Sequence, residues 1–516
     1  MLRAALIALL LIAAPARAAD PVSAGDDVLR IGLRGPLLQR DPQLASSPDE
    51  GVVIRALYRG LMRDDARGLP VPDLVQEIDS AADGLTHRLR LGAAHWSDGR
   101  PVTATDAVAS LRRLADAALA SPHRHLLADL ALAQAGAVLA GDLPPDALGV
   151  QAQGDDLLVL TTTRPVPDLA ALLAHPALAP LPAHAPGDWG VTSGPYRVDA
   201  GAAGVTLRLI RAPGADPAMP AVIEAHSPTD WPAAIDAFAA GGFDILPLPG
   251  AHLAAARARF GAQAVSVPLA CTWGYVVNLT DSAPPALRDP AIRRALSLAL
   301  DRRQIIDTVL GDGQQPALGW VPPALAPAAV AAADADRPQA ERMAEAEQIL
   351  ADAGYDAERP LLLRVASHTD PDARRLLDAL QYYWRPLNVI VRADEVGWDA
   401  HARRVAAGDF GLASFGWCAD WRDAAAFQQV FGPDGADPGG FANPDYRALL
   451  ALAQTRQGPS RAAAQSAANA VLDRELPVIA LFHYAAPVLV SDRVRGFATS
   501  NPMGRWYPQD IRLAPQ

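Results

Sequence analysis

The hydrophobic pattern of the chain switches repeatedly between two periods. Residues 85–91 alternate apolar and polar side chains, which is typical of a half-buried β-strand. Residues 50–62 instead carry apolar side chains three and four positions apart, which predicts a helix. The two patterns recur along the chain and predict further strands at 28–33, 205–210, 389–391 and 478–482 and further helices at 342–350 and 461–472. Helices that alternate with short strands indicate an α/β fold.

Capping side chains mark where two more helices begin. Thr103 and Asp106 form a capping pair for one helix. Asp289 and Pro290 supply the N-cap and the first turn of another, which we predict to continue unbroken as far as Gly311.

Length and composition favour several domains behind a secretion signal. At 516 residues the chain exceeds what one hydrophobic core usually serves, and its 50% apolar content suits two or three sizeable cores. Residues 1–19 combine Arg3, an apolar run and Ala16-Arg-Ala18, the pattern of a cleavable signal peptide. The apolar run is too short to span a membrane. No cysteine stands nearby to carry a lipid, so we expect a soluble periplasmic protein that is not lipid-anchored.

Charge and missing motifs exclude several classes of function. A net charge of −12 at pH 7 argues against binding to nucleic acid or to an anionic membrane surface. All 45 basic residues are arginines, which excludes Schiff-base chemistry and a P-loop lysine. The chain contains no GxSxG, HExxH, Walker A, GxGxxG or paired CxxC motif. We therefore predict that the protein is not an enzyme and uses no cofactor.

The histidines give little evidence for a metal site. Among 11 histidines, His123 and His125 form the single close pair. One pair at this spacing is weak evidence for metal binding. We predict that both are solvated surface residues and that the protein holds no metal.

The densest group of candidate functional residues lies at 416–421. Asp420 stands between Trp417 and Trp421, so its carboxylate would be partly shielded from water and would need a cationic partner. A ligand ammonium group would serve, and the indole faces would add stacking area and cation–π attraction. The alternative interpretation is that Asp420 caps a turn and the tryptophans are ordinary core packing.

This segment resembles one known family. Phe410, followed after five residues by Gly-Trp-Cys-Ala-Asp-Trp, is similar to the ligand-binding segment of the periplasmic oligopeptide-binding proteins, the peptide-binding components of ABC importers. Further motifs of that family stand in the same order along nearly all of the chain after the signal: Tyr58-Arg-Gly-Leu61, the stretch 94–106, Thr192-Ser-Gly-Pro-Tyr196, and Asp301-Arg302.

The resemblance implies a two-lobed periplasmic-binding-protein fold with an additional smaller domain. Two α/β lobes would be joined at a hinge and close on a ligand in the cleft between them. The implied boundaries are the signal peptide at 1–19, lobe I at 20–58, 183–270 and 487–516, the extra domain at 59–182, and lobe II at 271–486. A peptide would be held as an added strand through its main chain.

The resemblance also assigns roles to individual residues. Asp420 would take the α-amino group of the ligand, and Cys418 would offer backbone groups beside it. Trp417 and Trp398 match aromatic positions of the side-chain pockets. Two further positions, Gly416 and Ser47, complete the candidate ligand-binding set, although the acidic residue that assists the ammonium in the best-known members has no counterpart near Ser47 unless Asp49 or Glu50 reaches the site.

The cysteines also allow two interpretations. Cys271 and Cys418 are the two cysteines of the chain, and in an oxidising compartment they form either one disulfide or two separately buried thiols. The resemblance implies the disulfide. Closing so long a loop would stabilise the fold by about 4–5 kcal/mol on the chain-entropy argument.

The chain departs from the family where the C-terminal carboxylate of a peptide is bound. The aligned positions hold Leu310, Asp372, Val405 and Ser414, none of which is basic. Arg404 lies one position away and is the candidate replacement, with a solvated arginine as the alternative. Either other groups or water receive the far end of the ligand, or that end is not an ordinary peptide carboxylate.

We therefore expect the periplasmic component of an ABC importer. It would capture peptides or peptide-like amines as a monomer and deliver them to a permease in the inner membrane, with no role for nucleic acid. One rival of the same fold is a binder of another solute, such as a metal chelate, a glycoside or an antimicrobial peptide. A secreted hydrolase is the rival of a different class.

Overall fold

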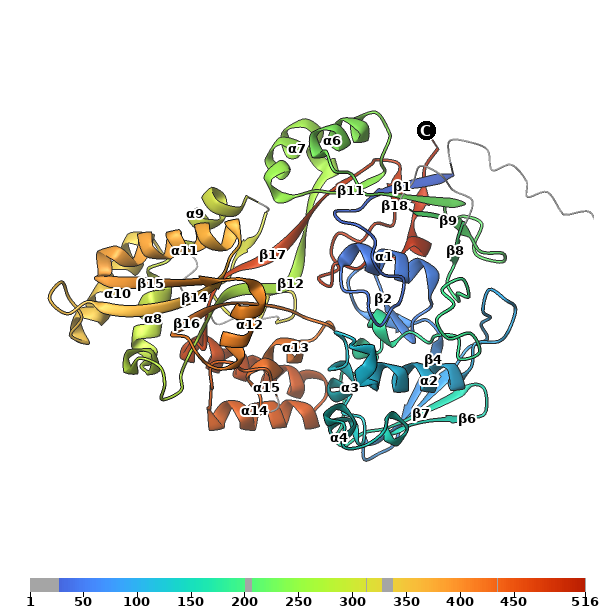
Figure 1. The fold of residues 1–516 in the computed structure, drawn as a ribbon, viewed down its shortest axis with the longest axis horizontal. Coiled ribbons are helices and arrows are strands. Elements are labelled where there is room, and N and C mark those ends of the chain that lie inside the picture. Colours follow the sequence, from blue (N-terminus) through green and yellow to red (C-terminus); the bar gives the residue numbers. More distant parts are fainter. Residues whose placement is uncertain (1–26, 200–206, 312, 327–336, 434, 516) are drawn as a thin grey trace, which may run out of the picture.

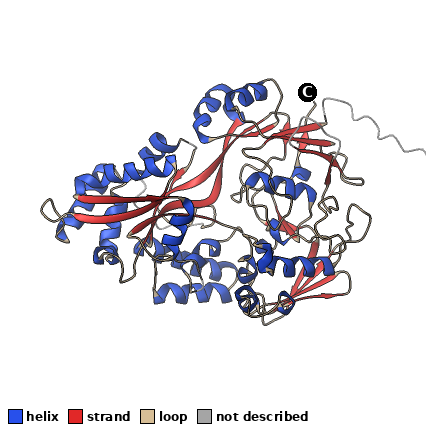
Figure 2. Cartoon of the chain, in the orientation of Figure 1, coloured by secondary structure: helices blue, strands red, loops and turns tan. Residues whose placement is uncertain are grey.

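The computed structural model describes residues 27–199, 207–311, 313–326, 337–433 and 435–515. The predicted signal peptide lies outside these residues. Helices and strands alternate along the described chain (Figures 1 and 2), which confirms the prediction of an α/β fold. The largest sheet has 11 strands, and its main path follows the order β15-β14-β16-β12-β17-β11-β1-β10-β9-β8.

One end of this sheet forms what we call the first half of the molecule. Its strands are β1 (Val28–Gly32), β8 (Tyr196–Val198), β9 (Leu207–Arg211), β10 (Val222–His226) and β11 (Ile245–Pro247). Its helices are α1 (Pro48–Leu57), α6 (Trp231–Ala239) and α7 (Leu253–Phe260). The short pair β18 (Val494–Arg495) and β19 (Arg512–Leu513) comes from the C-terminal segment.

The other end of the sheet, at the left of Figure 1, forms the second half. Its strands are β13 (Gln315–Pro316), β14 (Leu361–His368), β15 (Val389–Val396) and β16 (Leu412–Cys418). Its helices are α8 (Pro290–Leu298), α9 (Arg302–Ile305), α10 (Gln339–Asp352), α11 (Pro371–Trp384), α12 (Trp398–Ala406), α13 (Ala425–Gln428), α14 (Pro444–Thr455) and α15 (Gly458–Glu475). Apolar faces of α8, α10 and α11 pack on the strands around the fully buried Trp384.

A separate four-stranded sheet with the order β4-β5-β7-β6 forms a small unit beside the first half. Its strands are β4 (Val75–Ser80), β5 (Thr86–Leu91), β6 (Val150–Gln153) and β7 (Leu157–Thr161), and the pair β2 (Met62–Asp64) and β3 (Pro70–Pro72) leads into it. Its helices are α2 (Ala104–Ala115), α3 (Leu126–Asp129), α4 (Ala135–Ala140) and α5 (Leu169–Leu172). The predicted alternation holds in β5, where His87, Leu89 and Leu91 are buried and Arg88 and Arg90 are exposed.

Two long strands join the halves. β12 (Ala264–Val277) and β17 (Val478–Val490) pair antiparallel along most of their length and belong to both ends of the large sheet. Their register shifts between Pro268 and Thr272, so the ladder is interrupted at the crossing from one half to the other. A bulge bends a strand and increases its local twist. The change of direction therefore falls where the two halves meet, close to the boundaries expected near residues 270 and 486, although the domain boundaries themselves stay a prediction.

Two predicted helices end earlier than the apolar spacing suggested. α1 stops at Leu57 because Tyr58 is extended, and the next two backbone N–H groups donate to Ser193 Oγ at 3.1 Å and Asp73 Oδ2 at 2.9 Å instead of to helix carbonyls. The helix that begins at Pro290 breaks after Leu298 and does not run unbroken to Gly311. Asp301, which we expected to continue that helix, is instead the N-cap of α9.

Two predicted helix starts are confirmed. Thr103 and Asp106 form a reciprocal capping box on α2, and Asp289 caps α8 through the N–H of Ala291 at 2.8 Å. Within the described residues, no helix combines the length and the apolar character that a membrane crossing needs.

Candidate functional site

A large cleft lies where the two halves meet. Its volume is about 1180 Å³, and it is lined both by α1 in the first half and by β16 and α12 in the second. The interrupted part of the β12–β17 ladder forms its base, because Leu269, Ala270, Cys271 and Tyr484 all line it. The crossing strands therefore place the cleft at the junction of the two halves.

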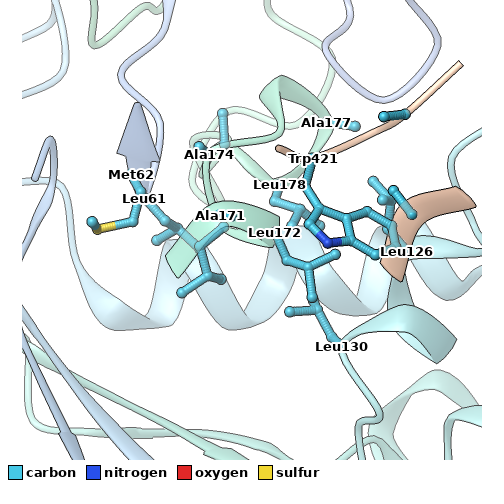
Figure 3. Packing of buried hydrophobic residues seen from close by; sticks show 14 of the residues in the cluster. Leu61, Met62, Leu126, Leu130, Ala171, Leu172, Ala174, Ala177, Leu178 and Trp421 are labelled. Atoms are coloured by element: carbon cyan, nitrogen blue, oxygen red, sulfur yellow. The ribbon is translucent and has the colours of Figure 1, made fainter. Parts of the chain in front are cut away.

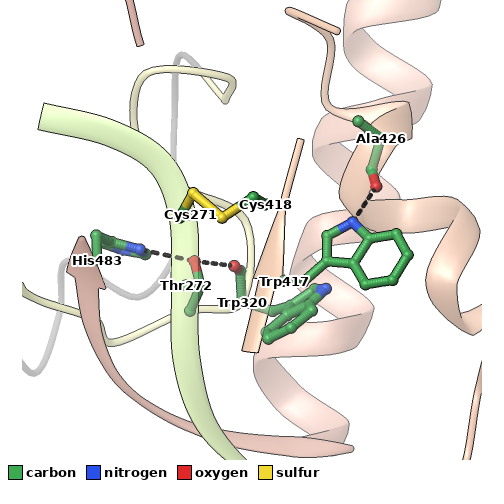
Figure 4. The surroundings of a disulfide bond; sticks show 7 residues. All are labelled: Cys271, Thr272, Trp320, Trp417, Cys418, Ala426 and His483. Carbon is green, nitrogen blue, oxygen red and sulfur yellow. Dashed lines mark hydrogen bonds between the residues drawn. A yellow bond between two sulfur atoms is a disulfide. The ribbon is translucent and has the colours of Figure 1, made fainter. Parts of the chain in front are cut away.

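The predicted disulfide is present. Cys271 on β12 and Cys418 on β16 stand directly opposite each other in the antiparallel ladder, with their Cα atoms 4.0 Å apart, and are bonded (Figure 4). Beside them, Thr272 Oγ1 donates to the carbonyl of Trp320 at 2.9 Å and lies 2.9 Å from His483 Nδ1. The bond closes a sequence separation of 147 residues and holds the end of β16 against the base of the cleft.

Five of the predicted ligand-binding residues line this cleft. They are Ser47, Trp398, Gly416, Trp417 and Cys418. The indole N–H of Trp417 donates to the carbonyl of Ala426 at 2.8 Å, which fixes the ring (Figure 4). Trp398 is 65% exposed and meets the ring of His368 edge-on. An exposed tryptophan on a cleft wall has apolar area free for a ligand.

Asp420 follows the last residue of β16 by two positions and lies just beyond the cleft lining. Its Oδ2 atom is 2.9 Å from His125 Nε2, and its Oδ1 atom is 3.8 Å from His175 Nε2. Arg505 Nη2 donates to the backbone carbonyl of Asp420 at 2.7 Å. Burial alone would raise the pKa of Asp420, but the hydrogen bond from His125 and the charges of His125 and Arg505 hold its pKa below the ordinary value. The carboxylate is therefore ionised at neutral pH.

The structure confirms that His125 is exposed, but the prediction of two freely solvated histidines needs correction. His125 is 46% exposed but forms the hydrogen bond to Asp420, and His123 lines the cleft with its ring against that of His175. Burial lowers the pKa of His125, but the hydrogen bond and charge of Asp420 outweigh it and raise the pKa overall. Burial, together with the charge of Arg505, keeps the pKa of His175 well below its ordinary value, so this ring is neutral at neutral pH.

Among residues covered by the structure, no three His, Cys, Asp or Glu side chains are arranged to hold a metal ion. The loop carrying His123 and His125 folds back on Asp420, a residue about 295 positions away in sequence, and spacing alone could not show this contact.

Trp421 is not part of the cleft wall. It is 3% exposed and packs among Leu126, Leu130, Leu172 and Leu178 of the small unit (Figure 3). Its indole N–H donates to Asp168 Oδ2 at 2.7 Å. The core-packing interpretation therefore holds for Trp421, whose side chain anchors the segment after β16 to the small unit.

The acidic residues near Ser47, Asp49 and Glu50, accept hydrogen bonds from backbone N–H groups. Asp49 Oδ2 accepts from the N–H groups of Arg34 at 2.8 Å and Gly35 at 3.3 Å. Glu50 accepts from the N–H groups of Ser46 at 2.9 Å and Ser47 at 3.1 Å and completes a capping box on α1. Neither carboxylate lines the cleft, so neither assists Asp420 in this arrangement.

Of the four positions that align with the carboxylate-binding residues of the family, two line the cleft and two do not. Val405 and Ser414 line the cleft, whereas Leu310 and Asp372 do not. Arg404, the candidate cation, forms an ion pair with Asp394 and lies outside the lining. Ser414 instead faces two imidazoles, with its Oγ atom 3.2 Å from His401 Nε2 and 3.5 Å from His368 Nδ1.

Three arginines line the cleft that were not predicted from the sequence as site residues. Arg34 after β1, Arg55 on α1 and Arg505 in the C-terminal segment all line the first-half wall. None of the described residues that line the cleft is an aspartate or a glutamate. The one available sequence signal was Gly51, a glycine inside a helix one turn before Arg55.

Comparisons with known proteins find relatives along nearly the whole chain. The family model described as "Bacterial extracellular solute-binding proteins, family 5 Middle" matches residues 70–438. The periplasmic oligopeptide-binding protein OppA of Salmonella typhimurium is 28% identical over 98% of this chain and 96% of its own. The probable deoxycholate-binding periplasmic protein YgiS of Escherichia coli is 28% identical over 92% of this chain and 91% of its own. Among solved structures, Haemophilus influenzae OppA in complex with RPPGFSPFR is 26% identical, with a TM-score of 0.73 over 95% of this chain and 99% of that one.

Proposed function

The chain belongs to family 5 of the bacterial extracellular solute-binding proteins, and from this premise we propose that it binds peptides or peptide-like amines in the cleft between its halves. It works in the periplasm after cleavage of its signal peptide, as a monomer, and releases the ligand chemically unchanged to an ABC permease of the inner membrane. The whole-length similarity to oligopeptide-binding proteins supports this choice of ligand.

The position of Asp420 is the observation that carries the proposal. Its carboxylate is 27% exposed, ionised, and two residues from Cys418, whose disulfide fixes the edge of the cleft. An α-ammonium group has three donors and pairs with such a carboxylate. In the structure His125 is hydrogen-bonded to this carboxylate. We infer that the ligand ammonium replaces the imidazole when the ligand binds.

The experiment compares a peptide that has a free amino terminus with its N-acetylated form. Isothermal titration of the purified protein should show binding of the free tripeptide and a loss of at least about tenfold on acetylation, because a charge-assisted hydrogen bond contributes about 1.5–3 kcal/mol. Mass spectrometry of the mixture should return the peptide intact. Equal affinity for the two forms would refute the role of Asp420, and cleavage products would refute the assignment as a binding protein.

A second candidate ligand is an amphipathic anion. The cleft wall combines exposed Trp398 with arginines and lacks lining carboxylates, a combination that suits an apolar body bearing an acid group. The relative YgiS is named as a probable deoxycholate-binding protein, which supports this second candidate. Titration with deoxycholate in parallel with the tripeptide separates the two candidates.

A further inference from the structure

Arg55 is a buried cation whose terminal nitrogens lack a protein partner. The residue lies in the last turn of α1, is 7% exposed, and lines the cleft. Its Nε atom donates to the carbonyl of Trp506 at 2.9 Å, and its guanidinium lies over the ring of Tyr507, 5.5 Å from the centroid. No described carboxylate comes within ion-pair distance of it, and within the described chain its two Nη atoms make no hydrogen bond.

Gly51 makes room for this guanidinium. A Cβ atom at Gly51 would stand 2.9 Å from Arg55 Nη1, so the side chain of Arg55 extends back over the helix backbone one turn earlier. Glycine inside a helix destabilises it by about 1 kcal/mol relative to alanine. Gly51 therefore lowers the stability of α1, but its missing Cβ lets the Arg55 guanidinium lie along the cleft wall.

The surrounding charges leave the wall positive. Arg505 is buried next to Arg55, and its Nη1 atom lies 3.2 Å from Asp64 Oδ2. Arg34, which also lines the cleft, makes no side-chain hydrogen bond or ion pair with a described residue. Among these three guanidinium groups, Arg505 alone forms an ion pair with a described residue, Asp64, while the charges of Arg34 and Arg505 also act at longer range on Asp49 and Asp420. A buried charge without a partner is unfavourable, so such a site calls for an anion.

We propose that Arg55, with Arg505 beside it, binds a carboxylate group of the ligand on the first-half wall of the cleft. The proposal rests on the proposed function in that the same cleft holds the ligand and Asp420 receives its amine. A guanidinium presents parallel N–H donors that fit a carboxylate, and the two Nη atoms of Arg55 are the free pair. Because Arg505 also contacts the carbonyl of Asp420, the acid group binds near the ligand amine. The ligand class is a peptide-like solute with a carboxylate close to its amino terminus, such as an acidic side chain.

The test uses two variants that act on Arg55 differently. Arg55→Gln removes the charge, whereas Gly51→Ala keeps it and displaces the guanidinium while favouring the helix. Arg67→Gln, at an exposed arginine with 72% of its side chain accessible, is the matched control for lost charge. The first probe is glutarate, compared with chloride at equal ionic strength. Glutarate should raise the melting temperature of wild type and Arg67→Gln but not of Gly51→Ala or Arg55→Gln, because a ligand stabilises the state that binds it.

Equal glutarate shifts in all four proteins, or no shift in any, would overturn the subsite. A second arm titrates Ala-Glu-Ala and Ala-Gln-Ala, with free and amidated C-termini. Wild type should prefer the Glu peptide by about tenfold to a hundredfold, and both Arg55-directed variants should lose that preference while still binding the Gln peptide. A preference that follows the free C-terminus instead would identify the end carboxylate as the group that is bound. A glutarate effect without any peptide binding would leave the subsite standing and refute the peptide proposal.

Discussion

At the scale of single residues, the chemistry of the cleft depends on a few charges drawn from distant parts of the chain. Asp420 could be picked out from sequence because two indoles and a cysteine surround it within six positions. Its partners could not, since His125 and Arg505 lie about 295 and 85 residues away. Such contacts join residues that are far apart in the sequence, so no local sequence pattern predicts them.

The first prediction concerns the carboxylate itself. Asp420→Asn keeps the shape and removes the charge, so the ligand ammonium loses its anionic partner. Removing one member of a partly buried charge pair typically costs about 2–5 kcal/mol. Isothermal titration should therefore show a large loss for a peptide with a free amino terminus and little further loss for its N-acetylated form. If the variant binds the peptide with wild-type affinity, Asp420 is not the partner of the ligand ammonium.

Arg55 shows why a residue that we propose to bind ligand can escape sequence analysis. In the apolar pattern of residues 50–62 it is an ordinary polar interruption within a predicted helix. Its significance comes from the contact with Trp506, more than 450 residues away, and from the missing Cβ of Gly51. A glycine in a helix interior is the local sign that something approaches the backbone closely.

At the scale of elements, periodicity and caps located most helices and strands but not always their ends. The helix from Pro290 ends at Leu298, and a new helix starts at Asp301 because the side chain of Asp301 accepts from the N–H of Gln304 at 3.0 Å. An aspartate that serves as an N-cap and one that stays within a helix look alike in sequence. α1 ended early for a similar reason, because tertiary partners capture the N–H groups after Tyr58.

The second prediction belongs to the pairing of β12 with β16. The Cys271–Cys418 bond closes a separation of 147 residues. It should stabilise the fold by about 4–5 kcal/mol because it lowers the conformational entropy of the unfolded chain. Urea unfolding of the Cys271→Ser, Cys418→Ser double variant should show this loss, and reduced wild type should match it. Thiol labelling of denatured, non-reduced protein should find no free cysteine. Two labelled thiols would contradict the bond.

At the scale of the whole molecule, the segment after β16 ties the second half to the small unit. Trp421 is buried among residues of the small unit, and Arg461 of α15 lies 3.6 Å from Asp168 of that unit while also pairing with Asp423. Burial and the charge of Asp423 raise the pKa of Asp168, against the lowering effect of Arg461. The His125–Asp420 contact lies along the same junction, so the ligand that we propose to pair with Asp420 would act on a joint between two parts of the molecule.

The last prediction is that this joint makes ligand binding depend on pH. The pKa of His125 is raised, so its contribution is complete below the ordinary histidine value, about 6.5, and is lost as pH rises through the raised value. The pKa of Asp420 is lowered, so its contribution is present above about 3.9 and is lost only as pH falls through the lowered value. The pair is therefore strongest between these limits, where charged His125 competes best with a ligand ammonium.

Peptide affinity should accordingly stay level below about pH 6.5 and rise above it, until the α-amino group of the ligand loses its proton at about pH 7.7–8.0. Neighbouring groups also titrate, above all Asp129, whose pKa burial raises to about 6 against the lowering effect of His125. Titrations of wild type and His125→Gln at each pH isolate the contribution of the pair, because Asp129, His123 and His175 are present in both proteins. The rise should flatten in His125→Gln. A wild-type slope that persists in the variant would assign the pH dependence to another group and would show that the ligand ammonium does not displace His125.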